Sequence, residues 1–532
     1  MLEKIQVEEN TGTLEERRDH SLAKRIINGQ ELTQYGDLNA LEILKRTPGV
    51  SIPAGKGKKG SPGKGYTVVL IDGDEVSAGS RRRGNPLEQI TSDMIERIEV
   101  MTNGSAEYTA ESMGGIVNIV LKKPKAQGLT TAKITGGTYG GDVPMASLFL
   151  QREGKNGNLA YIFNVNAADN QEKDTSSTSK VGVDYEVRDN TIRNQSLGIG
   201  TKFIYSPTSK DKYTFDGSVT KNENKSHTDT NSTTRLLSNY EKSRSTMLWA
   251  AIKGEHHLSG TELLDWKLKF HENSDNGHSG AVQSLPTANV SLQEDKSSFR
   301  VLGTDGSYSH VRGDHFIKAG AELKGLTQRD EVVRDVNGTD VTTSGDQVSL
   351  HQTKGALYVQ DEISFGESMV MTPGIRYESV TRDYGATSHI DYFAPSLHML
   401  WRLSPQDNLR ASVAKTVKLP RLDEFSTSYD STFERNDIRH PDTTGNANLT
   451  EEKALSYELR LEHFFEDKGI ASIGSFYRTI EDKIERVTQF DTVTSRYVQR
   501  PYNVGQGYLW GIELEVKKSL ISYVEGFGTF AN

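Results

Sequence analysis

Two hydrophobic patterns divide the sequence. Residues 1–125 contain short, continuous apolar runs, which are typical of buried strands in a small α/β unit. From residue 128 onward, apolar and polar residues alternate in stretches of about ten, as in residues 160–168 (AYIFNVNAA) and 197–205 (LGIGTKFIY). Such alternation is typical of strands with one apolar face and one polar face. The patterns therefore predict a small α/β domain followed by a large all-β domain.

The apolar runs of the N-terminal part predict individual elements. Residues 67–71 (TVVLI) predict a buried strand, and residues 72–74 (DGD) predict a tight turn. Residues 91–93 (TSD) predict a helix cap, which is followed by a short helix and a strand at residues 98–101. Residues 116–121 (IVNIVL) predict a further strand. We find no catalytic motif among these elements.

The alternating part places charged residues on one face of its strands. Leu459 and Leu461 alternate with Glu458 and Glu462, so we expect the leucines to face lipid and the carboxylates to face a wet lumen. A soluble β-sandwich alternates too, and its charged face would look at water outside. Polar stretches such as residues 222–245 separate the alternating ones, and we expect long loops there.

Composition narrows the choice of function class. The chain has 532 residues, a formal net charge of −9 and no cysteine, which argues against a nucleic-acid partner and excludes disulfides and thiolate metal sites. Mean hydropathy is −0.59, and no apolar run reaches the roughly 18 residues that a membrane helix needs. Low hydropathy does not decide between a soluble protein and a membrane barrel, because only alternate residues of a barrel strand face lipid.

Short strings along the chain carry a resemblance to a known family. The strings of the N-terminal part are LIDG (70–73), IERIEV (95–100), SAEY (105–108) and GGIVNIVLKK (114–123). In this order and spacing they resemble the plug domain of TonB-dependent outer-membrane receptors. The downstream strings are GALYVQDEISFGESMVMTPGIRYE (355–378), GNANLTEEKALSYELRLEHFF (445–465) and NVGQGYLWGIELEVKKS (503–519). They resemble barrel strands of the same receptors.

The resemblance implies a mainly β fold, a large antiparallel transmembrane β-barrel filled by an N-terminal α/β plug. We expect an N-terminal segment at residues 1–20, the plug at 21–125 and the barrel at 126–532. Barrels with a plugged lumen have about 22 strands, more than this chain provides room for at the spacing seen. No signal peptide follows Met1, and the sequence ends at Asn532 in what reads as mid-strand. We therefore expect the signal peptide and the last strands to be missing.

The N-terminus resembles the TonB box of the family. Glu3, Lys4, Ile5, Gln6 and Val7 combine an acidic residue with alternating apolar residues. An extended segment of this kind can pair with a sheet edge of a partner through its backbone. The resemblance therefore implies that these residues bind TonB, and the plain alternative is a frayed polar terminus.

Arg81, Arg82 and Arg83 follow the strand and turn in the plug, in a loop that the family places toward the outer mouth. Clustered guanidinium groups bind carboxylate and catecholate oxygens well. We therefore interpret the three arginines as ligand-binding residues. The alternative is a solvated basic loop or a set of ion pairs with carboxylates of the barrel wall.

A second candidate site locks the plug to the barrel. In the family, the arginine that matches Arg97 packs toward barrel glutamates, and Glu458 and Glu513 are the carboxylates in the matching strings. The resemblance therefore implies a lock formed by Arg97, Glu458 and Glu513. The alternative is an ordinary surface ion pair worth about 0–1 kcal/mol.

The resemblance implies a TonB-dependent transporter in the outer membrane of a Gram-negative bacterium, energised by the inner-membrane proton gradient through TonB. The expected ligand is a ferric siderophore, with vitamin B12, haem, a glycan or a peptide as alternatives within the same fold. An all-β surface-adhesion or binding protein remains the alternative from another class, and a ligand-sensing transducer of the same fold is a third possibility. We find no nucleophile–base motif and no metal-ligand spacing, so we expect neither an enzyme nor a bound cofactor or metal.

Overall fold

The structure is a computed structural model that describes residues 17–29, 32, 39–47, 50, 67–75, 87, 90–125, 127–139, 143–180, 183–232, 236–285, 288–342, 346–384, 387–425, 436–438, 441–466, 469–519 and 530–531. Glu3–Val7 and Arg81–Arg83, the TonB-binding and ligand-binding candidates, lie outside these residues.

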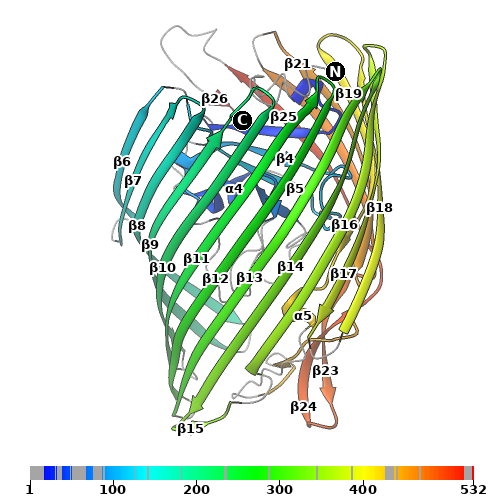
Figure 1. Cartoon of the computed structure of the whole chain (residues 1–532). Helices are drawn as coiled ribbons and strands as arrows, with labels where there is room; N and C mark the ends of the chain where they lie inside the picture. Colours follow the sequence, from blue (N-terminus) through cyan, green and yellow to red (C-terminus); the bar gives the residue numbers. More distant parts are fainter. Residues whose placement is uncertain are drawn as a thin grey trace.

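The larger part of the molecule is a closed antiparallel β-barrel whose neighbouring strands follow one another along the chain (Figure 1). Its strands are β6 (Leu129–Tyr139), β7 (Val143–Asn156), β8 (Leu159–Lys180), β9 (Val183–Tyr205), β10 (Asp211–Asn231), β11 (Leu236–Ser259), β12 (Glu262–Leu285), β13 (Asn289–Arg312), β14 (His315–Val336), β15 (Thr339–Asp340), β16 (Gln347–Phe365), β17 (Met369–Asp383), β18 (Thr387–Arg402), β19 (Asp407–Lys418), β21 (Glu452–Phe464), β22 (Ile470–Glu481), β25 (Gly507–Ser519) and β26 (Phe530–Ala531). The antiparallel all-β architecture that the alternation predicted is confirmed.

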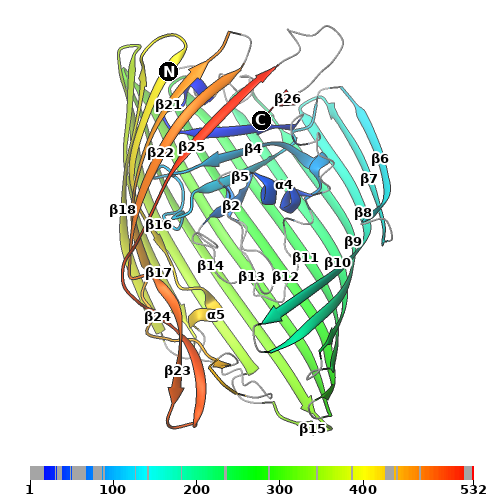
Figure 2. The same cartoon turned by 180° about the vertical axis from the view of Figure 1, so that it is seen from behind.

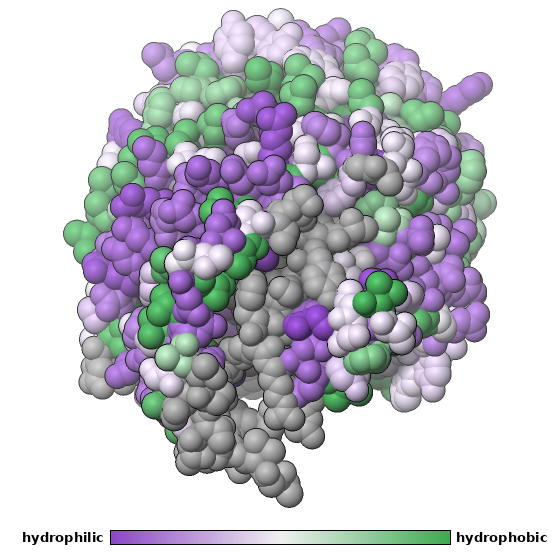
Figure 3. Space-filling model, turned by 90° about the horizontal axis from the view of Figure 1, so that it is seen from below, coloured by the Kyte–Doolittle hydropathy of each residue, from purple (hydrophilic) through white to green (hydrophobic). Residues whose placement is uncertain are grey.

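The two ends of the barrel differ in how their strands are connected. At one end, which we call the short-turn rim, turns of a few residues join the strands, such as residues 157–158 and 313–314. At the other end, the long-loop rim, the two longest connections join β19 to β21 and β22 to β25, and they carry α5 (Leu422–Phe425), β20 (Asp442–Thr443), β23 (Ile484–Asp491) and β24 (Arg496–Asn503). Hydrophilic residues gather on this rim, and hydrophobic residues lie mostly toward its outer edge (Figure 3).

Burial along the strands is the reverse of that in a soluble protein. Leu459 and Leu461 are 50% and 44% exposed, whereas Glu458 and Glu462 are 7% and 1% exposed. The leucines therefore form the outer face and the carboxylates line the interior, as the alternation predicted. An apolar outside with a polar inside is what a barrel in lipid requires. Among the described residues, no helix is both long enough and apolar enough to cross a membrane.

The prediction of a long polar loop at residues 222–245 is wrong. Asn222 pairs with Ser245, and β10 and β11 continue as a ladder as far as the pair Asn231 and Leu236. Most barrel strands are accordingly much longer than the stretches of about ten residues expected from the alternation. Where a strand projects into water both of its faces are wet, so it loses the hydrophobic alternation without losing its backbone pairing.

The plug is a mixed five-stranded sheet in the half of the barrel nearer the short-turn rim (Figure 2). Its strands, in the order in which they pair, are β1 (Lys24–Asn28), β4 (Ile95–Met101), β5 (Ile116–Leu121), β2 (Val68–Ile71) and β3 (Asp74–Glu75). The helix α4 (Ala40–Arg46) packs its buried residues against this sheet, and the Asn39 side chain accepts a hydrogen bond from Glu42 N at its start.

The predicted elements of the plug are present with small shifts. The predicted strands at residues 67–71 and 116–121 are β2 and β5. The predicted helix before β4 is a single 3-10 turn, Ser92–Met94, and β4 begins three residues earlier than expected. In the turn between β2 and β3, Asp72 and Gly73 take positive φ angles of 48° and 82°, a conformation that glycine adopts without strain. This turn projects from the sheet toward the barrel wall.

Candidate functional site: the plug–barrel interface

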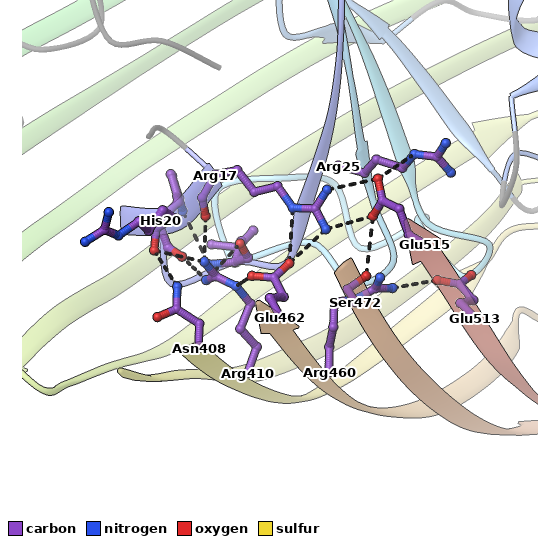
Figure 4. Close-up of polar contacts among 12 residues, drawn as sticks. Arg17, His20, Arg25, Asn408, Arg410, Arg460, Glu462, Ser472, Glu513 and Glu515 are labelled. Atoms are coloured by element: carbon purple, nitrogen blue, oxygen red, sulfur yellow. Dashed lines mark hydrogen bonds and ion pairs between the residues drawn. The ribbon is translucent and has the colours of Figure 1, made fainter. Parts of the chain in front are cut away.

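The plug is tied to the barrel near the short-turn rim by a buried group of charges, which we call the Arg17 cluster: Arg17, Arg410, Glu462 and Glu515 (Figure 4). Arg17 belongs to the plug, at the start of the described chain. Its guanidinium lies 2.9 Å from Glu462 of β21 and 2.9 Å from Glu515 of β25. Glu462 also accepts from Arg410 of β19, at 2.9 Å. Glu462 is therefore shared by two buried arginines, which are 3% and 2% exposed, and Glu515 supplies the second negative charge.

Arg410 also binds the backbone of the plug. It donates to the carbonyl oxygens of Arg17 at 2.6 Å, of Arg18 at 3.2 Å and of His20 (Figure 4). Asn408, two residues along β19, donates to the Arg18 carbonyl at 2.9 Å. The wall thus holds the first described residues of the plug through their backbone as well as through the Arg17 side chain.

The barrel register explains why these wall residues meet. Asn408 pairs with Glu462, Glu462 with Ser472, and Ser472 with Glu515, so all four occupy one level across four neighbouring strands. Residues at one level across a sheet project to the same face. Arg17 reaches from the plug across this level and bridges the two carboxylates.

The opposite side of the plug carries the opposite charge. The turn between β2 and β3 presents carboxylates to lysines of the barrel wall. The ion pairs are Asp72–Lys202 (3.0 Å), Asp74–Lys267 (2.9 Å), Asp74–Lys269 (3.2 Å) and Glu75–Lys324 (2.9 Å). Attraction by Lys324 lowers the pKa of Glu75 to about 2, so this carboxylate is ionised at neutral pH.

A third contact lies between residues 103–113 of the plug and strands β16 and β17. The fully buried Glu378 accepts a hydrogen bond from Ala110 N at 3.1 Å and pairs with Lys354 at 2.8 Å and Arg376 at 2.5 Å. Lys354 also reaches Glu111 of the plug at 2.8 Å. The polar groups of this contact are therefore shared between plug and wall.

The lock predicted from Arg97 to Glu458 and Glu513 differs from the contacts in the structure. Arg97 lies on β4 and binds Glu99, two residues away on the same face, at 2.8 Å. Glu458 and Glu513 instead bind Arg460 of the wall, at 3.2 and 2.5 Å. Arg97 has a partner of its own in the plug because side chains two apart on a strand are neighbours.

The plug arginine that binds buried glutamates of the wall is Arg17, which the sequence did not single out. Arg17 lies in the polar stretch 15–20 (EERRDH), where no hydrophobic pattern marks a buried position. The signal that could have found it is the alternation of Glu458, Arg460 and Glu462 on the inner face of β21. Charged side chains that are buried require partners of opposite charge. Those on the inner face of β21 do not all find one in the wall, so the plug must provide some.

Comparison with known proteins agrees with this architecture. A family model for the TonB-dependent receptor-like β-barrel matches residues 125–532, and one for the TonB-dependent receptor plug domain matches residues 16–116. The two matches together cover most of the chain and divide it where the structure changes from sheet to barrel.

Three relatives give the degree of similarity. The ferric enterobactin receptor PirA of Pseudomonas aeruginosa is 23% identical over 527 residues, which cover 89% of this chain and 69% of that protein. The iron-regulated outer membrane virulence protein of Vibrio cholerae is 21% identical over 484 residues, covering 87% of this chain and 66% of that protein. The crystal structure of the ferric enterobactin receptor PfeA, in complex with BCV-L6, superposes with a TM-score of 0.70 at 17% identity and covers 93% of this chain and 78% of that one. The chain thus spans about two thirds of the length of these curated relatives. It belongs to the TonB-dependent receptor family.

Proposed function

We propose that this protein is an active transporter of the outer membrane of a Gram-negative bacterium. In this proposal it takes up a ferric siderophore and draws its energy from the inner-membrane proton gradient through TonB. The observation that carries the proposal is the polar plug–barrel interface: a folded domain fills the lumen and is held there by ion pairs and hydrogen bonds. The named relatives support the choice of ligand, because two of them are ferric enterobactin receptors.

The composition of the interface suits a plug that must move. When water enters the lumen, it can rehydrate charged side chains that have separated. Separating these ion pairs therefore costs less free energy than exposing an apolar core. In the Arg17 cluster, Arg17, Arg410 and Glu462 are buried, so this cluster resists separation more than exposed ion pairs do. Arg17 also lies within the N-terminal segment of residues 1–20, close to its end. A pull on that segment therefore acts on this cluster before any other part of the plug.

The pull is supplied by TonB. In our proposal Glu3, Lys4, Ile5, Gln6 and Val7 pair with TonB by strand addition. Residues 17–22 lie nearer the short-turn rim, so this rim faces the periplasm and the long-loop rim faces outward (Figure 1). Ligand is captured at the long-loop rim and leaves past the displaced plug. Vitamin B12, haem, glycans and peptides are the other ligands that this fold could carry.

Growth under iron limitation tests the proposal. A strain that lacks this protein is supplied with ferric enterobactin, ferric citrate or haem as the sole iron source, and uptake of radioiron is measured alongside growth. We expect loss of growth on one of the ferric siderophores, restored by the full-length gene in a TonB-containing strain and not in a strain without TonB. Normal growth and uptake on every siderophore would contradict the iron proposal, and rescue without TonB would contradict the coupling.

Arg81, Arg82 and Arg83 provide a prediction about ligand capture. Replacing all three by glutamine should weaken binding of a ferric catecholate at least about tenfold, because charge-assisted hydrogen bonds to its oxygens are lost. Equilibrium binding to cells at 0 °C, where transport stops, measures the change. Replacing Lys122, Lys123 and Lys125, a matched basic cluster at the end of the plug, should leave affinity unchanged. Equal affinity of the arginine variant and the wild type would assign the cluster to the solvated-loop alternative.

A further inference from the structure

Four wall lysines occupy a single register level of the barrel. Lys202 of β9 is at the level of Asp216, which pairs with Ala251, which in turn pairs with Lys269 of β12. From Lys269 the level continues through Gly303 to Lys324 of β14 and on to Lys354 of β16. We call Lys202, Lys269, Lys324 and Lys354 the lysine row. All four side chains point into the lumen, because each forms an ion pair with a carboxylate of the plug.

The lysine row descends through the barrel. Lys202 lies three residues from the end of β9 at Tyr205, and Lys354 lies eleven residues from the end of β16 at Phe365. Both strand ends are at the short-turn rim. The difference of eight residues corresponds to about 26 Å measured along the strands. Because barrel strands are tilted, a level perpendicular to them forms a ramp from the short-turn rim toward the long-loop rim.

Small residues make the row continuous. At this level Ala251 lies next to Lys269 on one side and Gly303 on the other, and Asp216 lies between Ala251 and Lys202. A Cβ atom on Gly303 would lie 2.7 Å from Lys269 Cε and 3.0 Å from its Cγ. The Lys269 side chain therefore lies across β13 in the space that the glycine leaves, and its ammonium group is carried toward Lys324. No bulky side chain separates these two cations at their level.

At rest the row is covered by carboxylates of the plug, most of them on one small element. Three of the four partners, Asp72, Asp74 and Glu75, lie on the turn and edge strand β3. This strand is at the edge of the plug sheet and pairs with β2 at two positions. When the plug moves, the lysines lose these plug carboxylates. Lys202, Lys269 and Lys354 keep ion pairs with the wall carboxylates Asp216, Asp305 and Glu378, whereas Lys324 loses Glu75. An anion that replaces the carboxylates is therefore favoured.

We propose that the lysine row is an internal binding surface for a polyanionic metal chelate, covered by the carboxylates of the β2–β3 turn at rest and occupied by the chelate during its passage. This inference rests on the proposed function and specifies the ligand class by its charge. The chelate offers carboxylate or catecholate oxygens in place of those of Asp72, Asp74 and Glu75. The row then guides it past the plug along the wall from β16 to β9.

The two partners of one ion pair provide the test. Lys324→Gln and Glu75→Gln remove the same 2.9 Å contact, but only the first removes a cation of the row. If the row binds the chelate, Lys324→Gln should lower the maximal uptake rate of radioiron-labelled ferric enterobactin by about tenfold. Glu75→Gln should leave that rate unchanged or raise it. Binding at 0 °C should be the same in both variants, because capture takes place at the long-loop rim.

Equal loss of uptake in the two variants would overturn the inference, since the pair would then serve only to seat the plug. Immunoblots of outer-membrane fractions report whether each variant is present at wild-type level. If Lys324→Gln does not reach the membrane, Lys202→Gln and its partner Asp72→Asn replace the pair, with the same expected contrast. Absence of ferric enterobactin uptake by the wild type would overturn this inference and, if every other ferric siderophore also fails, the proposed function. If the wild type takes up ferric enterobactin and the two variants lose uptake equally, only the inference about the lysine row is overturned.

Discussion

Replacing Glu462 by alanine should release the plug from the short-turn rim and make the outer membrane permeable to large solutes. The substitution leaves Arg17 and Arg410 buried beside each other without their shared carboxylate. Breaking a buried pair by removing one partner costs about 3–5 kcal/mol, and here two cations lose it. We expect cells that produce the variant to become sensitive to vancomycin, which does not cross an intact outer membrane. The purified variant should also lose its N-terminal residues to protease faster than the wild type.

Glu513→Ala is the matched control for this substitution. Glu513 is a glutamate of the same wall, and it binds Arg460 of the barrel at 2.5 Å. Its removal should therefore leave both vancomycin sensitivity and proteolysis near the wild-type level. If the two alanine variants behave alike, the Arg17 cluster is not what holds the plug. The same comparison decides between this cluster and the lock predicted from Arg97.

Gly374→Val should prevent the plug from seating. A Cβ atom at position 374 would lie 2.8 Å from Ala106 Cβ of the plug and 3.1 Å from Gln360 Cβ. Neither atom is at the end of a flexible side chain, so the backbone of the plug or of the wall must move. Overpacking typically costs about 1–3 kcal/mol, and valine adds two further carbon atoms in the same direction. We expect raised vancomycin sensitivity and slower uptake of ferric enterobactin.

Two further variants separate this steric effect from a general cost of changing a strand glycine. Gly355 lies on the neighbouring strand β16, and a Cβ there meets no atom within 4 Å, so Gly355→Val should be tolerated. In the milder variant Gly374→Ala, the additional change Ala106→Gly removes the opposing methyl group and should restore tight seating. Failure of this second change to rescue the first would show that the clash with Ala106 is not the cause.

Local patterns in the sequence predicted individual strands, and the resemblance to the receptor family predicted how they are arranged. The apolar run at residues 116–121 gave the bounds of β5, and the alternation around Leu459 gave the orientation of β21. Both follow from the environment of a single strand, so they are written in a few consecutive residues. The extension of β10 and β11 through residues 222–245 could not be predicted in this way. Outside the membrane the pairing of a strand depends on its neighbour rather than on its own hydrophobic pattern.

The partners across the plug–barrel interface are a property of the assembled molecule. Arg17 and Glu462 are 445 residues apart, and neither is distinguished by its sequence neighbours. The resemblance predicted that a plug arginine binds glutamates of the wall, but it pointed to Arg97, which binds Glu99 of the plug instead. The lysine row is spread over separate strands, and its members become neighbours only through the barrel register. Charges on a wet lumen wall carry no hydrophobic signal from which register could be predicted.

The separation of charge across the plug has a consequence for assembly. Arg17 and Arg25 face glutamates of β21 and β25, whereas the acidic turn faces lysines of β9, β12 and β14 on the other side of the barrel. A plug turned by about half a revolution would set cation against cation and anion against anion. Such like-charge contacts cost several kcal/mol, and a charged cleft acts on an entering partner before contact. The electrostatic field inside the barrel therefore favours one rotational orientation of the plug about the barrel axis during folding.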